Sequence, residues 1–313
     1  MPDIFLLVPW LFYATVIGIS LLVGSFLNVV IYRLPIMMER EWDEHVADWQ
    51  ANKDDATIKD PVSDAGDQRE AQTDNANETF NLATPRSACP HCDRPITAIE
   101  NIPVLSYAAL GGKCRGCKAP ISLRYPFVEL LTAALSAWVA MHFGIGLEAV
   151  AGVALTWCLV ALSGIDIDKQ LLPDSITLPL VWLGLFLSLF HVDSATTLFI
   201  APSDAIAGAL AGYLSLWSVY QLFKLITGKE GMGYGDFKLL AALGAWLGWQ
   251  KLPVIIMLSA AVGAAFGIAM IIFDRERKGR PMPFGPWLAA AGFLAMLYGA
   301  EIMDYYLAIT GLG

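Results

Sequence analysis

The stretch Gly231-Met232-Gly233-Tyr234-Gly235-Asp236-Phe237-Lys238 places three glycines, an acid and a lysine directly before an apolar run, Leu239 to Trp249. An ionisable side chain beside bilayer hydrocarbon is costly, so it usually faces a partner or a watery cavity. Glycine permits backbone conformations that a β-carbon forbids and lets another segment approach closely. The stretch therefore predicts a site in which Asp236 has a partner. The candidate partner is Asp166, at the end of another apolar run.

The composition is that of a membrane protein. Of the 313 residues, 56% are hydrophobic and only 16% are charged, which is unusual for a soluble domain. Long, mostly apolar runs recur along the chain. We predict an all-α polytopic membrane protein with about eight transmembrane helices. The predicted spans are about 7–31, 127–143, 149–165, 176–190, 204–226, 238–249, 252–273 and 285–308. The run 238–249 is too short to cross a bilayer unaided at 1.5 Å per residue.

The net charge of −9 comes from one segment. Between Glu39 and Glu78 there are 13 acids against only four basic residues, so this segment alone accounts for the whole excess. The remainder of the chain is neutral, and we expect no nucleic-acid partner. The first half of the long polar segment is rich in Asp, Asn, Ala and Gln. We interpret it as a partly disordered insert with a short helix around Trp42 to Trp49.

The lysines and arginines predict the orientation in the membrane. If the long polar loop is cytoplasmic, 19 of the 20 basic residues fall in cytoplasmic loops or at their membrane edges, and only Lys251 lies outside. Asp166 ends the third span and Asp236 begins the sixth, so both reach the cytoplasmic side. The lysines and arginines predict this topology without reference to the acids, so the agreement independently supports pairing the acids.

Four cysteines form the pattern Cys89-Pro90-His91-Cys92 and Cys114-Arg115-Gly116-Cys117. Two such turns can deliver four thiolates to a tetrahedral Zn²⁺, which stabilises a small unit that lacks its own core. The alternative is a pair of disulfides, but these require an oxidising compartment. With all four positions taken, the metal site would be structural. Cys158 stands alone in an apolar span and is expected to be a small core residue.

Asp166 and Asp236 admit two interpretations. Paired carboxylates that share one proton can activate a water with one member while the other polarises a carbonyl, as in aspartic proteases. The structural alternative is a helix-terminal acid and an ion pair with Lys169 or Lys238. Asp168 competes with Asp166 for the catalytic role.

Two other acids have structural explanations. Asp174 follows a proline and precedes the fourth span, where it is expected to be an N-cap. Glu129 is expected in the first turn of the second span, where the helix dipole favours an acid.

Several motifs together resemble the bacterial type IV prepilin peptidases. Gly233-Tyr234-Gly235-Asp236 matches the GxGD signature of membrane aspartyl proteases. Further matches are the two cysteine pairs and the stretches Val23-Gly24-Ser25-Phe26-Leu27-Asn28-Val29-Val30, Arg124-Tyr125-Pro126, Leu171-Leu172-Pro173-Asp174, Gly228-Lys229-Glu230-Gly231-Met232 and Pro283-Phe284-Gly285-Pro286. The resemblance covers nearly the whole chain except the acidic insert.

The resemblance implies a bifunctional enzyme of the bacterial inner membrane. Such enzymes cleave the basic leader of type IV prepilins and type II secretion pseudopilins after a glycine. They then methylate the new N-terminal residue with S-adenosylmethionine. The family's catalytic pair falls on Asp166 and Asp236, and its metal ligands fall on Cys89, Cys92, Cys114 and Cys117. The sequence shows no Rossmann-type glycine motif, so no residues can be named for the methyl donor.

These observations predict four regions. They are a first transmembrane helix (1–35), an acidic cytoplasmic insert (36–84), a cytoplasmic four-cysteine zinc-binding domain (85–125) and a membrane aspartyl peptidase domain (126–313). Three alternatives stay open: a peptidase without methyltransferase activity, a proton-coupled transporter, and a non-catalytic scaffold. The transporter also uses intramembrane acids and broken helices, but the two halves of this chain do not repeat one hydropathy pattern.

Overall fold

The computed structural model describes residues 5, 7–57, 80–97, 99–191, 198–273 and 282–310. The regular secondary structure in these residues is helical, and turns and loops connect the helices. The helices are α2 (Pro9–Thr57), α3 (Leu105–Ala109), α4 (Arg124–Phe143), α5 (Leu147–Lys169), α6 (Asp174–Leu187), α7 (Pro202–Thr227), α8 (Tyr234–Leu247), α9 (Leu252–Phe273) and α10 (Gly285–Thr310). Three short 3₁₀ turns are η1 (Ile99–Asn101), η2 (Ser188–Phe190) and η3 (Trp249–Lys251). The described residues form only two isolated β-bridges, so the all-α prediction is confirmed.

Six helical segments in the described part of the chain are long and apolar enough to cross a membrane. They are Pro9–Lys53, Arg124–Phe143, Leu147–Lys169, Pro202–Thr227, Trp249–Met270 and Gly285–Ile309. Each of the eight predicted spans corresponds to a helix, but two of these helices are shorter than a bilayer requires. The segment Asp174–Phe190 is one, and α8, with 14 residues, is the other.

α8 is the centre of the bundle. Nearly all of its residues from Asp236 to Leu247 are buried, because α6, α7 and α10 surround it. α7 approaches closely through glycines: a Cβ on Gly208 would lie 2.2 Å from the carbonyl oxygen of Gly244, and one on Gly212 would lie 2.5 Å from that of Leu240. Small residues four apart allow such close packing between membrane helices. A helix enclosed in this way does not need bilayer-spanning length.

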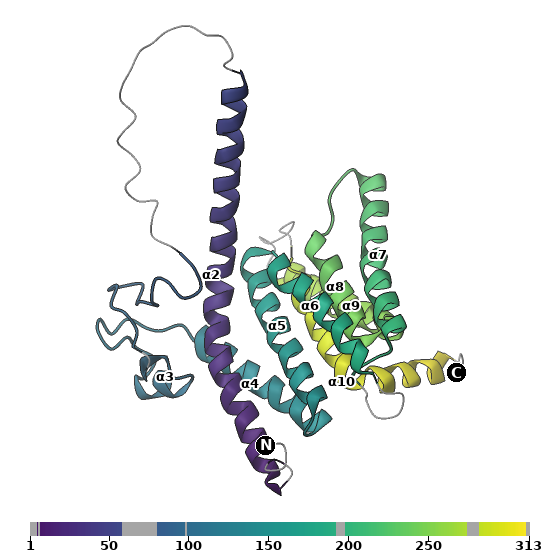
Figure 1. The fold of residues 1–313 in the computed structure, drawn as a ribbon, viewed down its shortest axis with the longest axis horizontal. Coiled ribbons are helices and arrows are strands. Elements are labelled where there is room, and N and C mark those ends of the chain that lie inside the picture. The colour runs from purple at the N-terminus through teal and green to yellow at the C-terminus, as the bar shows by residue number, and fades with distance from the viewer. Residues whose placement is uncertain are drawn as a thin grey trace.

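α2 is longer than predicted. The expected short helix from Trp42 to Trp49 is part of one continuous helix that begins at Pro9 and ends at Thr57. Its 49 residues measure about 74 Å at 1.5 Å per residue, more than twice the hydrocarbon thickness of a bilayer. Figure 1 shows its C-terminal half projecting beyond the other helices. Residues 58–79 of the predicted insert lie outside the described residues.

Candidate active site and cysteine cluster

Asp166 lies one turn before the C-terminal end of α5 and is buried, with 6% of its surface exposed. Its Oδ2 accepts a 2.9 Å hydrogen bond from the backbone N–H of Gly285, the first residue of α10. A helix N-terminus presents N–H groups without intrahelical partners, and these favour an acidic side chain. The end of α5 and the start of α10 therefore meet at this carboxylate.

Asp236 lies in the first turn of α8 and is also buried, with 7% of its surface exposed. Leu172 packs against the glycine next to each acid. A Cβ on Gly235, which precedes Asp236, would lie 2.6 Å from the Cβ of Leu172, and one on Gly285, which bonds to Asp166, would lie 3.1 Å from its Cδ2. Asp236 is within electrostatic range of Asp166. The fold thus brings together two buried acids that are 70 positions apart in the sequence.

The lysines offered as ion-pair partners for these acids are engaged elsewhere. Lys169 pairs with Glu39 at 2.8 Å, and Lys238 pairs with Asp174 at 2.6 Å. The structural alternative for Asp166 and Asp236 therefore loses both of its named partners. An ion pair with either lysine therefore does not account for the two buried acids.

Asp168 lies at the surface and pairs with Arg124, the first residue of α4, at 2.5 Å. This pair links α5 to α4. The Lys169 pair links α5 to α2, and the Lys238 pair links α8 to α6, so all three lie near the ends of the helices that carry the two buried acids. Asp168 is thereby a surface ion-pair residue, whereas Asp166 faces the interior.

The expectation for Asp174 was wrong. It is the first residue of α6, its N-cap is Pro173, and no side chain caps the helix. The Asp174 carboxylate instead forms an ion pair with Lys238, and both of its oxygens lie within 2.7 Å of the ammonium nitrogen.

The expectation for Glu129 was also wrong. α4 begins at Arg124, so Glu129 lies beyond the first turn. It is buried, with 7% exposed, and its Oε2 accepts a 2.8 Å hydrogen bond from the backbone N–H of Val104. Glu129 therefore fastens the cysteine-containing segment to α4.

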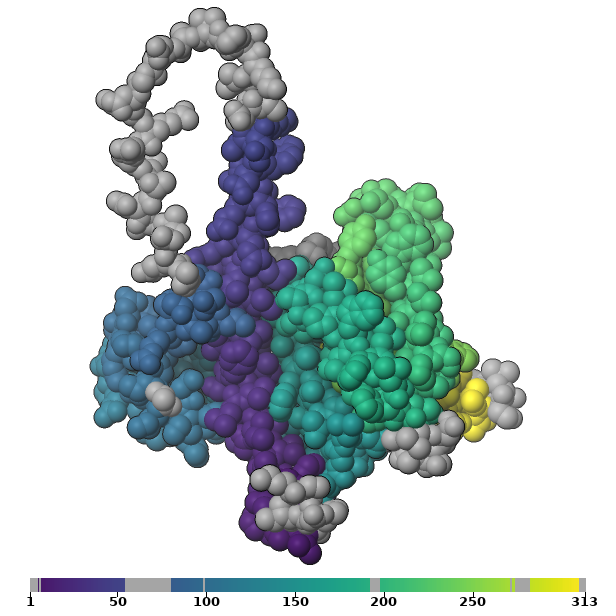
Figure 2. Space-filling model, in the orientation of Figure 1, coloured from purple at the N-terminus to yellow at the C-terminus, as the bar shows by residue number. Residues whose placement is uncertain are grey.

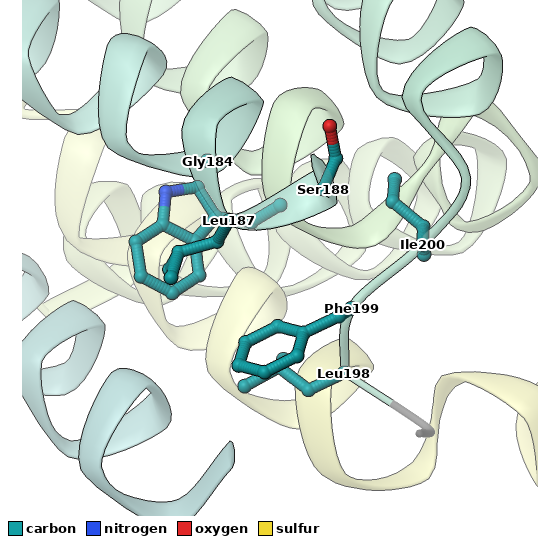
Figure 3. A pocket seen from close by; sticks show the side chains of 7 residues that line it. Gly184, Leu187, Ser188, Leu198, Phe199 and Ile200 are labelled. Atoms are coloured by element: carbon teal, nitrogen blue, oxygen red, sulfur yellow. The ribbon is translucent and has the colours of Figure 1, made fainter. Parts of the chain in front are cut away.

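Figure 3 shows a small, mostly apolar pocket. It is lined by Gly184, Leu187, Ser188, Leu198, Phe199, Ile200 and Trp246. Trp246 is ten residues beyond Asp236 on α8, so it lies about 15 Å further along the helix. This pocket is therefore a packing gap at the opposite end of α8 and carries no catalytic group.

The four cysteines converge in one cluster. The Sγ atoms of Cys89, Cys92, Cys114 and Cys117 all lie within 4.8 Å of one another. The Sγ atoms of Cys89 and Cys117 are 3.8 Å apart, and all four thiols are free. A tetrahedral ion with metal–sulfur bonds of about 2.3 Å places its sulfurs about 3.8 Å apart, whereas a disulfide requires about 2.05 Å. The cluster fits a metal ion and does not fit disulfides.

The two cysteine turns have matching backbone geometry. The fourth residue after the first cysteine of each pair has a positive φ, 52° at Asp93 and 61° at Lys118. In each turn the N–H of that residue donates to the carbonyl of the first cysteine, over 2.9 Å and 3.0 Å. The backbone N–H groups of Cys117 and Gly116 hydrogen-bond to the Cys114 sulfur and lower the pKa of its thiol to about 6. This favours the thiolate at Cys114, the form that binds a metal. Desolvation and the neighbouring cysteine sulfurs instead raise the pKa of the Cys117 thiol to about 11, so that thiolate would need the metal ion to form.

A helical membrane bundle that brings two buried aspartates within electrostatic range of each other has the architecture of a membrane aspartic peptidase. The comparisons agree with this class. Residues 18–143 match the bacterial peptidase A24 N-terminal domain, and residues 153–268 match the type IV leader peptidase family. The chain belongs to this family. No solved structure matches it at a significant level.

Curated relatives cover almost the whole chain. A prepilin leader peptidase/N-methyltransferase of Aeromonas hydrophila is 54% identical over 96% of this chain and 95% of its own length. The protein of that name from Pseudomonas aeruginosa is 51% identical over 97% and 96%. The one from Burkholderia pseudomallei is 46% identical over 96% and 88%. These relatives give no support to the transporter alternative.

Two contacts at the site were not predicted from the sequence. They are the N–H of Gly285 on Asp166 and the packing of Leu172 between Gly235 and Gly285. Both residues lie in quoted motifs, Leu171-Leu172-Pro173-Asp174 and Pro283-Phe284-Gly285-Pro286, which were noted only for their resemblance to the family. The signal available was a glycine between two prolines directly before an apolar run, which is a helix start that permits close approach.

Proposed function

We propose that this protein cleaves the leader from prepilins with Asp166 and Asp236, and then methylates the new N-terminal residue. The observation that carries the proposal is the pair of buried acids that the fold brings together from α5 and α8. Membership of the type IV leader peptidase family supports it, as do relatives named for both activities.

The two carboxyls would act as one unit. Two facing carboxylates repel each other, so they share a proton. The ionised member removes a proton from water, and the protonated member donates to the scissile carbonyl oxygen. The hydrogen bond from Gly285 N–H to Asp166 Oδ2 supports Asp166 as the ionised member, because a backbone donor favours the charged form. Asp236 would then polarise the carbonyl.

The substrate is a protein with a basic leader followed by an apolar helix. α7 and α9 are the spans with the largest share of exposed residues, so they offer an apolar surface to such a helix. A groove of about 400 Å³ lies between them, lined by Ala211, Ser215, Trp249, Leu252, Pro253, Ile256 and Met257. The substrate would approach sideways, through the lipid, with its scissile bond at the end of the bundle that holds the two acids. Type IV prepilins and type II secretion pseudopilins fit this description.

Methyl transfer would use S-adenosylmethionine, which supplies an electrophilic methyl group to the N-terminal amine. The names of the relatives support this activity. Methyl transfer to an amine does not require a carboxylate dyad, so the two activities should separate by mutation.

The cysteine cluster would hold Zn²⁺ as a structural ion. The separation of 3.8 Å between two of the sulfurs, and a set of four thiolates with no open position, support zinc in this role.

We place the protein in the bacterial inner membrane, with the two acids and the cysteine cluster on the cytoplasmic side. The distribution of lysine and arginine supports this orientation.

One experiment tests the proposal. Purified protein is incubated with a prepilin that carries its leader, with and without S-adenosylmethionine, and the products are weighed by mass spectrometry. Loss of the leader followed by a gain of one methyl group is the expected result. An intact prepilin would contradict the peptidase assignment, and cleavage without methyl gain would leave a peptidase alone.

A further inference from the structure

The cysteine module, residues 85–123, carries an exposed apolar face. Ile96, Ile99, Ile102 and Leu105 are 38%, 77%, 41% and 70% exposed, and all four fall within ten residues. A single exposed hydrophobic residue is ordinary, but four of them in ten residues of a small module are a candidate interaction site. We call these four residues the apolar face.

Two anchors fix the module to the membrane helices. Arg33, buried in α2, donates to the carbonyl oxygens of Asn81 at 2.9 Å and Pro85 at 2.6 Å. Glu129, buried in α4, accepts from the N–H of Val104, which lies between two members of the apolar face. The apolar face is therefore held in one position relative to α2 and α4.

Val104 is an unusual residue at this anchor. Its φ is +58°, a conformation that costs a β-branched residue about 1–3 kcal/mol. The N–H of Leu105 bonds back to Pro103 over this residue, which makes a tight three-residue turn. The turn aims the Val104 N–H at Glu129, and strain of this kind is retained where the surrounding structure requires it.

The module lies beside the helical bundle and away from the projecting end of α2 (Figure 1). Figure 1 shows α3 level with the N-terminal, purple part of α2, well below the end of that helix that projects from the bundle. Figure 2 shows the module beside the same part of α2 in space-filling form. The start of α4 also exposes apolar side chains, since Leu123, Tyr125 and Phe127 are 72%, 51% and 63% exposed.

The charge of the module complements an anionic surface. Residues 85–123 contain five basic side chains and two acids, in a protein whose net charge is −9. One of those acids, Glu100, is engaged by Arg94 at 2.9 Å and lies 3.7 Å from Arg115. Arg86, Lys113 and Lys118 are exposed on the same module.

We propose that the apolar face docks the cysteine module on the bilayer surface, with its basic side chains against anionic phospholipid headgroups. Apolar residues next to lysines and arginines bind such interfaces by burial combined with attraction to anionic lipid. The module would then be a peripheral membrane unit, held at the depth where α4 begins. This inference does not depend on cleavage or methylation.

Photolabelling tests the proposal. The full-length protein is reconstituted in vesicles of phosphatidylethanolamine and phosphatidylglycerol that contain a phospholipid with a diazirine in its acyl chain. Illumination followed by peptide mass spectrometry reads which segments touch lipid. Peptides from α7, the candidate span with the smallest share of buried residues, report insertion. The projecting part of α2 around Trp42 and Trp49, exposed by 70% and 62%, is the apolar control away from the membrane.

We expect labelling of residues 95–109 well above that of residues 42–53. Ile99→Gln combined with Leu105→Gln should reduce it by about threefold or more, while Trp49→Gln should leave it unchanged. Replacing phosphatidylglycerol with phosphatidylcholine should reduce labelling of the module but not of α7. Bound metal, measured on each variant, shows whether the module has stayed folded.

Two results would overturn the proposal. One is wild-type labelling of residues 95–109 no higher than that of residues 42–53, a comparison that needs no variant. The other is cross-linking of the apolar face to a second copy of the chain or to a substrate protein in place of lipid.

Discussion

The backbone N–H of Gly285 lies 2.9 Å from Oδ2 of Asp166, across 119 positions of sequence. Position 285 has no room for a side chain, because a Cβ there would lie 2.8 Å from the same oxygen. Gly285 therefore provides a hydrogen-bond donor and, because it has no side chain, allows Asp166 to approach closely. Both would hold the carboxylate in the position from which it can act on water.

Gly285→Ala should therefore impair cleavage without unfolding the protein. The added methyl group must displace Asp166 or shift the start of α10, and a displacement of about 1 Å at a reacting group costs about a hundredfold in rate. Leader removal by the purified variant measures this. Gly18→Ala is the matched control, since a Cβ at Gly18 meets nothing within 4 Å. Full activity of Gly285→Ala would show that the contact does not position Asp166.

Asp166→Asn and Asp236→Asn should each reduce cleavage by more than about a thousandfold, and the double variant should be no worse than either, because the two groups act as one unit. The readout is leader processing by purified protein. Methylation of a pilin that has already been cleaved should survive both changes.

Asp168→Asn is the control for these substitutions. It loses only an exposed ion pair with Arg124, which is worth about 0–1 kcal/mol, so substantial cleavage should remain. An inactive Asp168→Asn beside an active Asp166→Asn would reverse the assignment.

Glu129→Ala should release the cysteine module from α4. The substitution leaves the N–H of Val104 without its acceptor, a loss of about 1–3 kcal/mol. Hydrogen exchange at residues 99–109 should increase while the bound metal is retained. Glu129→Gln keeps an acceptor oxygen and should restore most of the protection; equal exchange in both variants would argue against this contact as the anchor.

Cys89→Ser and Cys114→Ser should each release the metal and loosen residues 85–123, because bound metal supplies much of the folding free energy of such small units. Metal analysis and limited proteolysis measure the two effects. Cys158→Ser, which changes a cysteine on α5 outside the cluster, should keep the metal. Wild-type protein that contains neither zinc nor another thiophilic ion would refute the prediction.

Deleting residues 48–77 should leave cleavage within about threefold of wild type, because exposed polar segments without a core tolerate removal. A loss of more than about tenfold in a variant that still inserts would assign this segment a direct role in cleavage.

The features predicted well from the sequence are those with a strong local signature. Apolar runs located the six described helices that are long enough to cross a membrane, and spacing alone grouped the four cysteines. The predicted length of α2 was too short, because the polar composition of the insert indicated disorder although its helix propensity is high. Residues 36–57 are too polar to form a core, but they are rich in helix-forming residues and continue a helix that is already nucleated, so extending it avoids the nucleation cost.

The contacts that were missed depend on tertiary structure. Whether Glu129 faces a helix dipole or the N–H of Val104 depends on where α4 begins and on how a loop 25 residues earlier folds back. The N–H of Gly285 is invisible to side-chain reasoning, since glycine offers no functional group to notice. Glu129 and Asp166 were both noted in the sequence, but the groups that donate hydrogen bonds to them are backbone N–H groups.

The bond from Gly285 to Asp166 also sets an order of events during synthesis. α5 and α8 leave the ribosome well before α10, so a growing chain holds both acids before it holds the donor that positions one of them. A chain that stops short of residue 285 would carry an incomplete site. Full proteolytic competence would then arrive only once α10 has joined the bundle.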